Sequence, residues 1–499
     1  KAVMHADLQS LDPIVTTVGI VQRHALLVYD TLFARDADQQ PQPQMVENYT
    51  VSEDGLEWSF TLRPGLMFHD GNPVTAADVV ASLRRWGARD AYGRQIFSIT
   101  EELAVVTART FRWRLQRPYG LMLHALSKTG GPVPVIMPER LARTDPATPV
   151  REAVGSGPFK FVADEWVPGG RVVYERFDGY QPRLEPPSGA AGGKQARVGR
   201  IEWLNIRDSQ SAVLALANGE IDLVESPAVE FLPLLRREGV EITRTDPLGT
   251  QGMLRMNHLH PPFDDPRARQ ALLFAIDQAE MLQAMFGDPE ITEVCHAFFI
   301  CGSPLASDAG VPAGIGSDPE RARELLQASG YDGRPIVTLH PTDILFMNIA
   351  TLVMADQLRE VGFNIELVAM DFGTMAARRA SRAPPDEGGW HLGLTYWPGV
   401  NVADPVGNIM LHASCEKAWP GWPCDADHQA MIDRFAFVQS GKERQALADA
   451  IQTSAYELVP YVIIGQWYLP TATRPQLKGL LKVPGTTVFW NLAKQSPGA

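Results

Sequence analysis

Residues 58–86 read WSFTLRPGLMFHDGNPVTAADVVASLRRW and carry a clear succession of secondary-structure signals. Residues Trp58–Arg63 alternate between apolar and polar side chains, and this two-residue period predicts a β-strand ended by Pro64 and Gly65. Thr75 then stands where the N-cap of a helix is expected. The helix itself is predicted from an apolar stripe at helical spacing, formed by Val79, Val80, Leu83 and Trp86.

Strands and helices alternate along much of the chain. Ser209–Asn218 is predicted as a helix and is followed by the strand Asp222–Val224. Asn348–Val361 is a second predicted helix, followed by the strands Asn364–Val368 and His391–Tyr396. This order predicts an α/β architecture with antiparallel insertions. An apolar periodic run from Ile20 to Phe33 predicts a further helix near the start.

The chain is too long for one hydrophobic core, so we expect at least two domains. Strands predicted at Glu241–Thr245 and Gly252–Asn257 flank a turn, and a matching return segment lies at Pro460–Tyr468. If the chain leaves one lobe near 248 and returns near 463, two strands form a hinge. The predicted limits are 1–248 with 464–499 for lobe I, 249–463 for lobe II, and 246–252 with 460–466 for the hinge.

The composition argues against several classes of function. The 499 residues include 45 Lys or Arg and 58 Asp or Glu, a formal net charge of −13, and nucleic-acid partners usually require a basic face. No apolar run approaches the roughly 18 residues that cross a bilayer. Residues Lys1–Leu11 lack the apolar segment of a signal peptide, so we expect that a signal peptide has already been removed.

The four cysteines form two close pairs in the sequence, Cys295 with Cys301 and Cys415 with Cys424. Neither pair has the spacing of a redox or zinc motif. Two short disulfide loops are the simpler interpretation, and four unrelated buried thiols are the alternative. Disulfides favour an oxidising compartment such as a bacterial periplasm.

Motifs of the common catalytic and cofactor sites are absent from the sequence: no GxxxxGK[ST], HExxH, GxSxG or strand-associated GxGxxG occurs. Their absence lowers the expectation of an enzyme, although a site assembled from distant segments would leave no motif. His258 and His260 would lie on one side of a strand, the minimum of a metal site. No third ligand is in register, so we predict neither a metal nor a cofactor.

Tryptophans are concentrated in the last quarter of the chain, at Trp397, Trp419, Trp422, Trp467 and Trp490. Trp397 precedes a Pro-Gly loop at a predicted strand end, which suits a pocket where aromatic rings hold a small organic ligand. Trp419 and Trp422 lie inside the predicted Cys415–Cys424 loop, where core packing is the stronger interpretation.

Several segments in the same order resemble the extracytoplasmic solute-binding proteins of ABC importers, in the family 5 class that includes dipeptide, oligopeptide and nickel receptors. The resemblance runs from about residue 11 to residue 492. It is carried by Leu11-Asp12-Pro13, Tyr29-Asp30-Thr31-Leu32, Ser52–Trp58, Leu62–Gly71, Pro73–Val79, Gly155–Phe159, Asn218–Asp222, Pro262–Ala271 and Asp404-Pro405.

The resemblance implies a two-lobed periplasmic-binding-protein fold of type II, cluster C, with an extra N-terminal subdomain at about 34–154. The Arg63–Val79 block would lie in that subdomain, away from the ligand. The implied function is a monomeric periplasmic receptor that closes around a small-molecule or short-peptide ligand and delivers it to the permease subunits of an ABC transporter. Its only membrane contact would be through that permease. An enzyme such as a hydrolase, or a peptide chaperone, on the same scaffold is the alternative.

The resemblance also points to residues of the binding site. Trp397 and Phe372 match motif positions of the family, whereas Val400 stands where peptide receptors carry an Asp that pairs with the ligand's α-ammonium. Residues Thr338–Asn348 contain no Arg to hold a ligand carboxylate and offer His340 instead. The ligand could therefore be peptide-like, another polar organic or a metal chelate. The full set of predicted ligand-binding residues is Thr16, Thr17, Val18, Arg94, Gln251, His340, Phe372, Trp397, Asn401, Asp404, Gln466, Trp467 and Tyr468.

Overall fold

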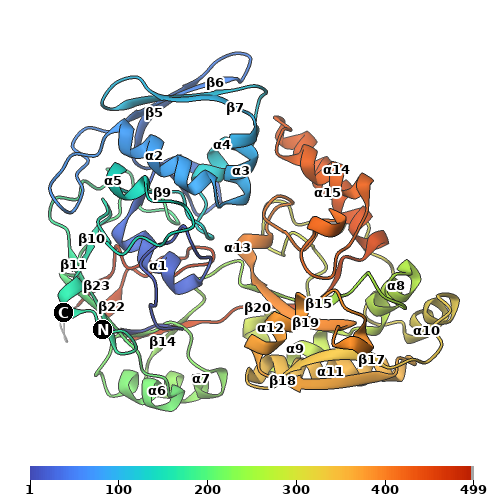
Figure 1. Ribbon diagram of the computed structural model, residues 1–499. Coiled ribbons are helices and arrows are strands. Elements are labelled where there is room, and N and C mark those ends of the chain that lie inside the picture. The colour runs from blue at the N-terminus through green and yellow to red at the C-terminus, as the bar shows by residue number, and fades with distance from the viewer. Residues whose placement is uncertain (496–499) are drawn as a thin grey trace. The chain divides into compact units, whose positions relative to one another are not determined.

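The computed structural model describes residues 1–495, which fall into two compact units (Figure 1). Unit 1 comprises Lys1–Pro247 and the segment from Leu469 onward, and unit 2 comprises Leu248–Tyr468. The second crossing thus comes after Tyr468 rather than near residue 463, because the strand before it pairs along its whole length inside unit 2. Within residues 1–495, no helix is long and apolar enough to span a membrane.

The main sheet of unit 1 has seven strands in the order β10-β11-β12-β1-β13-β21-β14. Its central strands β12, β1 and β13 are parallel, and the outer neighbours are antiparallel. The strands are β1 (Ala2–Val3), β10 (Phe159–Phe161), β11 (Arg171–Arg176), β12 (Arg200–Leu204), β13 (Leu223–Val224), β14 (Glu241–Thr243) and β21 (Thr471–Thr473).

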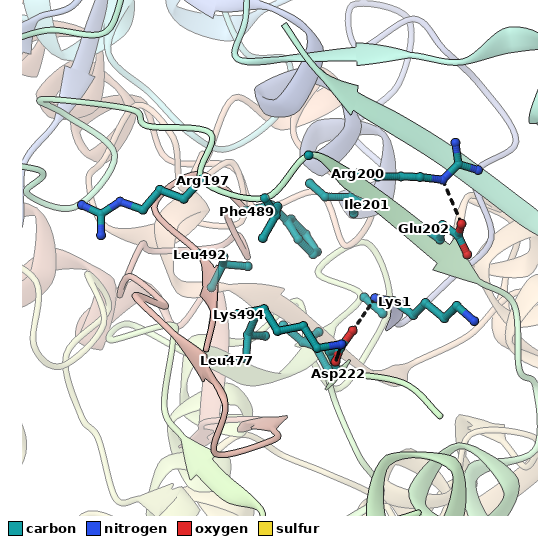
Figure 2. A pocket seen from close by; sticks show the side chains of 14 residues that line it. Lys1, Arg197, Arg200, Ile201, Glu202, Asp222, Leu477, Phe489, Leu492 and Lys494 are labelled. Carbon is teal, nitrogen blue, oxygen red and sulfur yellow. Dashed lines mark hydrogen bonds and ion pairs between the residues drawn. The ribbon is translucent and has the colours of Figure 1, made fainter. Parts of the chain in front are cut away.

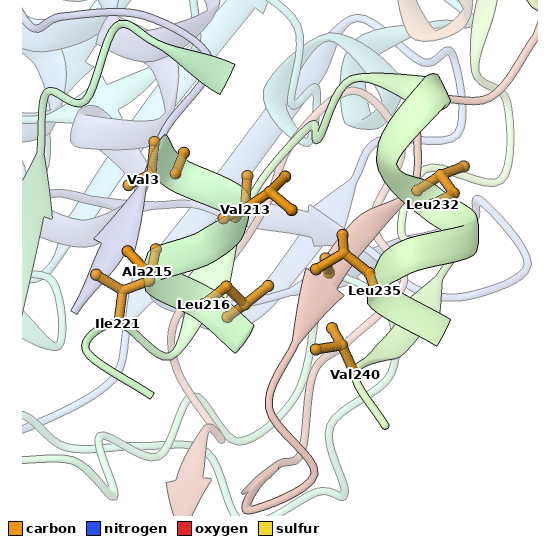
Figure 3. Packing of buried hydrophobic residues seen from close by; sticks show 11 residues of the cluster. Val3, Val213, Ala215, Leu216, Ile221, Leu232, Leu235 and Val240 are labelled. Atoms are coloured by element: carbon orange, nitrogen blue, oxygen red, sulfur yellow. The ribbon is translucent and has the colours of Figure 1, made fainter. Parts of the chain in front are cut away.

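Two helices, α6 (Ser209–Ala217) and α7 (Leu232–Arg237), pack apolar side chains against this sheet (Figure 3). Leu216 of α6 and Leu235 of α7 are fully buried in this cluster, which also includes Val3 of β1. Asp208 caps α6 by accepting a hydrogen bond from the Ser211 N–H at 2.7 Å. Burial of this apolar face therefore fixes α6 onto the sheet, since a short helix is marginal without tertiary packing.

Leu216→Ala is expected to lower the free energy of unfolding of unit 1 by about 2–5 kcal/mol, because it opens a cavity in a fully buried cluster. The measurement is urea unfolding followed by circular dichroism. Leu214→Ala in the same helix is the control, since Leu214 is 43% exposed. Equal losses for the two variants would contradict the packing described here.

The predicted strand and helix of residues 58–86 are confirmed. They are β6 (Glu57–Leu62) and α2 (Ala76–Gly87), and the Asp78 carboxylate accepts hydrogen bonds from the N–H and hydroxyl of Thr75 at the start of α2. They belong to a separate antiparallel sheet within unit 1, in the order β5-β6-β8-β7, against which α2 packs. Its other elements are β5 (Val46–Val51), β7 (Thr100–Val105), β8 (Thr110–Leu115) and α3 (Ala91–Ser98).

The predicted helix from Ile20 to Phe33 is wrong in its second half. Helix α1 spans Gly19–Val28 and ends at Tyr29, whose backbone is extended. The next residues form the short strand β2 (Asp30–Thr31), which pairs with β9 (Val135–Ile136). The two strands are over a hundred residues apart in the sequence, and their pairing overrides the local helical period. A local sequence pattern cannot predict a partner at that distance.

The remaining elements of unit 1 are short. They are β3 (Phe33–Arg35), β4 (Pro41–Pro43), α4 (Met122–Leu126), α5 (Glu139–Ala142), β22 (Leu477–Lys478) and β23 (Ala493–Lys494).

Unit 2 contains a six-stranded sheet in the order β16-β20-β15-β19-β17-β18. Strands β17, β18 and β19 are parallel to one another, and β15 is antiparallel to both β19 and β20. The strands are β15 (Thr250–Met256), β16 (Thr292–Glu293), β17 (Ile336–Pro341), β18 (Ile365–Met370), β19 (Leu392–Pro398) and β20 (Tyr461–Trp467). These directions bring the carboxyl ends of β17, β18, β19 and β20 to one end of the sheet, which we call the carboxyl edge.

Helices follow or precede most strands of unit 2, as the predicted α/β architecture requires. They are α8 (Pro266–Ala275), α9 (Gln278–Phe286), α10 (Pro319–Ala328), α11 (Leu345–Glu360), α12 (Phe372–Arg379), α13 (Gly399–Val402), α14 (Ala426–Phe435) and α15 (Gly441–Leu458). Both predicted disulfides, Cys295–Cys301 and Cys415–Cys424, are present in this unit.

Candidate functional site

The carboxyl edge of unit 2 gathers aromatic side chains from segments far apart in the sequence. In open α/β sheets, ligands bind outside the carboxyl ends of the strands. Strands β17, β18, β19 and β20 end here at Pro341, Met370, Pro398 and Trp467. The same edge holds Thr250, which pairs with Trp467, so both chain crossings to unit 1 leave unit 2 from this edge.

Tyr396 of β19 lies at the centre of an aromatic cluster. Its ring centroid is 5.2 Å from that of Phe346 in α11, 6.3 Å from that of Trp467 and 6.5 Å from that of Phe372 at the start of α12. Trp467 is buried, whereas Tyr396 and Phe372 are half-buried. The cluster thus has a buried base and a partly exposed rim, a surface suited to an apolar part of a ligand.

Trp397, the next residue of β19, points to the opposite face of the sheet because successive side chains of a strand alternate. Its ring is half-buried and meets the Trp419 ring edge to face, with centroids 6.5 Å apart. Arg379, the last residue of α12, places its guanidinium 4.2 Å from the Trp419 centroid. Its Nη1 lies 3.5 Å from the Thr395 hydroxyl, which is two residues before Trp397 and on the same face.

Gln251 and Gln466 are fully buried, and their amides serve the backbone. Gln251 donates to the Ala297 carbonyl at 3.0 Å, and Gln466 donates to the Leu248 and Cys301 carbonyls at 2.9 and 3.1 Å. Tyr468 is also buried, and its hydroxyl contacts the Glu293 carboxylate. These three residues therefore fix the strand ends at the crossings, and their role in ligand binding stays a prediction.

The other predicted residues of unit 2 follow the strand ends. The His340 Nε2 is hydrogen-bonded to the Asn348 Oδ1 at 2.6 Å, which ties the end of β17 to α11. Asn401 lies half-buried in α13. Asp404 accepts hydrogen bonds from the N–H groups of Val406 and Gly407 at 2.9 and 3.0 Å, which shapes the loop after α13.

In unit 1, the predicted residues Thr16, Thr17 and Val18 lead into α1, and Thr17 and Val18 are exposed. Arg94 is exposed on α3 and donates to the Arg89 carbonyl at 2.8 Å. Within residues 1–495, no described contact of these four residues shows what they would bind. Their role stays a prediction.

Sequence reasoning missed a charged group at the carboxyl ends of β1 and β13. Glu225, directly after β13, receives a hydrogen bond from the Nδ1 of His5 at 2.6 Å and pairs with Arg23 of α1. The carboxylate is almost fully buried. Burial by itself would raise the pKa of Glu225, but the charges of Arg23 and His5 outweigh burial and hold that pKa well below its usual range.

Acid is therefore expected to destabilise the protein partly through Glu225. Its folded pKa is lowered, so the unfolded state binds more protons below about pH 4.3, and stability falls as the pH falls through that range. Glu225→Gln is expected to cost about 1.5–3 kcal/mol at pH 7 and to flatten this acid dependence. Urea unfolding at pH 7 and pH 3 measures both effects, with the exposed Glu230→Gln as control. An unchanged slope in Glu225→Gln would refute the assignment.

Several further hollows lie in the two units. One beside the start of β1 in unit 1 and one beside the start of β17 in unit 2 are away from the carboxyl edges. The pocket of unit 1, about 440 Å³, has an apolar floor that includes Phe489, and Asp222 at its rim pairs with the amino groups of Lys1 and Lys494 (Figure 2). The pocket of unit 2, about 620 Å³, lies beside the start of β17, where His391 is engaged with the backbone of Val337 and Pro261. Most polar side chains that line these two pockets already bond to other groups of the protein.

No group of three or more potential metal ligands occurs among residues 1–495. His258 is half-buried, and desolvation of its ring together with nearby Arg269 and Arg255 holds its pKa well below the usual value. His260 contacts the Arg382 carbonyl instead of His258. The two imidazoles therefore do not converge on one position.

Comparison with known proteins assigns this arrangement to a family. Residues 40–419 match the family described as bacterial extracellular solute-binding proteins, family 5 Middle. The chain belongs to this family. A probable peptide ABC transporter periplasmic-binding protein of Sinorhizobium fredii is 39% identical to this family 5 protein over 493 residues, which cover 98% of this chain and 92% of the relative.

A more distant relative agrees with this assignment, and a solved structure shares the fold. A glutathione-binding protein of Pectobacterium atrosepticum is 25% identical over 498 residues, which cover 96% of this chain and 90% of that protein. The crystal structure of a dipeptide-binding protein from a Pseudoalteromonas species, in complex with Met-Leu, has a TM-score of 0.79 at 19% identity and covers 99% of this chain and 100% of its own. The predicted α/β periplasmic-binding-protein fold is confirmed by this likeness.

The predicted class of function is confirmed as well: this family 5 chain is an extracellular solute-binding protein for ABC transport, and its relatives are binding proteins rather than enzymes. The sequence alone did not indicate Arg379, Phe346 or the His5–Arg23–Glu225 group. Tyr396 had a weak signal through its neighbour Trp397, whereas the charged groups come together only through the fold.

Proposed function

We propose that this protein is a periplasmic receptor for a small peptide-like solute, which it binds against the carboxyl edge of unit 2 and delivers to an ABC permease. The proposal rests on one observation: half-buried aromatic rings lie on both faces of the sheet where both chain crossings leave it, with Tyr396 and Phe372 on one face and Trp397 on the other. The name of the 39% identical relative supports a peptide as the solute class.

The proposed mechanism is a population shift between an open and a closed arrangement of the two units. The chain crosses between them only at residues 247–248 and 468–469, and two crossing segments allow a hinge motion. A solute that contacts both units only when they are closed would favour the closed state. In unit 1, the proposed contacts are Thr16–Val18 and Arg94.

The proposed solute does not depend on a carboxylate at position 400 for its ammonium group, because Val400 stands there. His340 is already bonded to Asn348 and is largely buried. Recognition would therefore rely more on aromatic contact and less on paired charges at these two positions. This feature favours a blocked, modified or otherwise peptide-like solute over a free dipeptide.

The purified protein is expected to retain or take up a small organic solute, and native mass spectrometry of the protein before and after mild denaturation identifies it by mass. Isothermal titration with that solute then gives its affinity. Trp397→Ala is expected to weaken binding about tenfold or more, because an aromatic face is lost.

Trp58→Ala is the matched control, since Trp58 is a half-buried tryptophan of the subdomain sheet in unit 1. It is expected to leave the affinity unchanged. Equal affinity of Trp397→Ala and the wild type for the identified solute would exclude Trp397 from the site.

Saturation with the identified solute is expected to reduce the radius of gyration in small-angle X-ray scattering, because closure makes the protein more compact. The ligand-free protein, stripped by unfolding and refolding, is the reference. A tight solute that leaves the scattering curve unchanged would rule out the closing mechanism while leaving the binding site intact.

A further inference from the structure

Arg379 is a partly buried cation whose charge is not balanced by any described carboxylate. Its Nε is buried and makes no hydrogen bond within residues 1–495, and its Nη1 reaches only the neutral Thr395 hydroxyl at 3.5 Å. Burial lowers the pKa of Arg379 to about 10, with no acidic side chain opposing this effect. Removing a guanidinium from water without a counter-charge is costly, and the Trp419 ring is the main favourable contact that the described residues offer this charge.

Most of the other buried cations of the described chain have close partners, although Arg35 also lacks a described carboxylate and bonds only the His124 carbonyl. Arg85 pairs with Asp12, and Lys194 pairs with Asp30, each inside unit 1. Arg255, close to Arg379, is fully buried and donates to the carbonyls of Met410, Trp419, Pro420 and Pro460 at 2.8–3.0 Å. Arg255 is therefore a structural residue, and the contrast marks Arg379 as a different case.

The surroundings of Arg379 hold its guanidinium in place beside the proposed site. Trp419 lies in the Cys415–Cys424 loop, which Arg255 anchors through the carbonyls of Trp419 and Pro420. The Arg379 guanidinium lies over the Trp419 ring, 4.2 Å from its centroid. The Trp419 ring also contacts the Trp397 ring edge to face. A stacked, oriented guanidinium offers its donors as a planar fork that matches a carboxylate.

We propose that Arg379 is the anchor for an anionic group of the solute, a carboxylate in particular, while an apolar part of the same solute packs against Trp397. The proposal rests on the proposed function, because it places the solute at β19 of unit 2. It assigns specificity to the Arg379–Trp419 pair: acids bind, and the corresponding neutral amides do not. Trp419 and Arg255 act as positioning residues.

The first experiment offers the stripped protein two matched pools of N-acetylated di- and tripeptides, one with free C-terminal carboxylates and one with C-terminal amides. Native mass spectrometry measures the binding of each pool. The wild type is expected to bind the acids at least about tenfold better, as loss of a charge-assisted hydrogen bond implies. Arg379→Met is expected to lose this preference, and Arg379→Lys to keep part of it. Arg378→Met is the control, because Arg378 donates to the Gly389 carbonyl instead.

A second experiment does not require a peptide ligand. Arg379→Met is expected to leave the melting temperature of the stripped protein unchanged or higher, since an unbalanced charge is removed. Arg255→Met is expected to lower it by several degrees, because four carbonyls lose their donor. Phenylacetate, but not its neutral analogue phenylacetamide, is expected to raise the melting temperature of the wild type and not that of Arg379→Met.

The outcomes separate this inference from the proposed function. Equal binding of acid and amide pools by the wild type would overturn the role of Arg379 while leaving a peptide receptor in place. Binding of neither pool would reject the peptide class, and the phenylacetate shift then decides the anion site alone. Arg379 would be a structural residue if two results came together. The melting temperature of Arg379→Met would fall as far as that of Arg255→Met, and phenylacetate would still raise the melting temperature of Arg379→Met.

Discussion

The pairing of β15 with β20 is the constraint on which the candidate site depends. These strands lie next to the two crossings of the chain, and the ladder that joins Thr250 to Trp467 brings both crossings to one edge of the unit 2 sheet. The ladder contains a bulge opposite Gly252 and Met253. Gly465 adopts a φ of +127° there, and a Cβ at this position would lie 2.7 Å from Leu282 side-chain atoms. Only glycine is free of strain at position 465, so the bulge depends on Gly465.

The direction of the strands then decides what gathers at that edge. Because β17, β18, β19 and β20 all end there, residues 50 or more positions apart in the sequence become neighbours, as Tyr396 and Phe346 do with Trp467. Alternation along β19 divides the site into two faces. Tyr396 joins the aromatic cluster on one face, and Trp397 joins Trp419 and Arg379 on the other. A solute at the edge could therefore meet an apolar surface and a cation within a few residues of one strand.

Charge is distributed differently in the structural and the candidate functional parts of the chain. Buried ions such as Arg85 with Asp12 and Lys194 with Asp30 are paired, because an unpaired charge in the interior is strongly destabilising. Glu225 follows the same rule by pairing with Arg23 and His5. Arg379 departs from it, and departures from local rules tend to coincide with functional sites. The net charge of −13 gives no hint of this cation, because it averages over the whole chain.

Local patterns predicted those parts of the fold in which local forces dominate. The two-residue period of β6, the start of α2 at Thr75 and the short disulfide loops are all properties of nearby residues, and the structure has each of them. The helical period after Ile20 failed at Tyr29, since β2 pairs with a strand a hundred residues away. The amides of Gln251 and Gln466 were proposed as ligand contacts from their place at the crossings, and the structure shows that backbone carbonyls engage them.

The sequence by itself determined the family, the α/β class, the disulfides and the candidate residue Trp397, because each leaves a signature in neighbouring residues. Only the tertiary structure decided which charges are balanced. Arg255 and Arg379 have the same side chain in the sequence, yet one is bonded to four carbonyls and the other rests on Trp419 with its Nε unpartnered. The energy of a buried charge depends on the atoms that surround it, and folding from distant segments supplies those atoms.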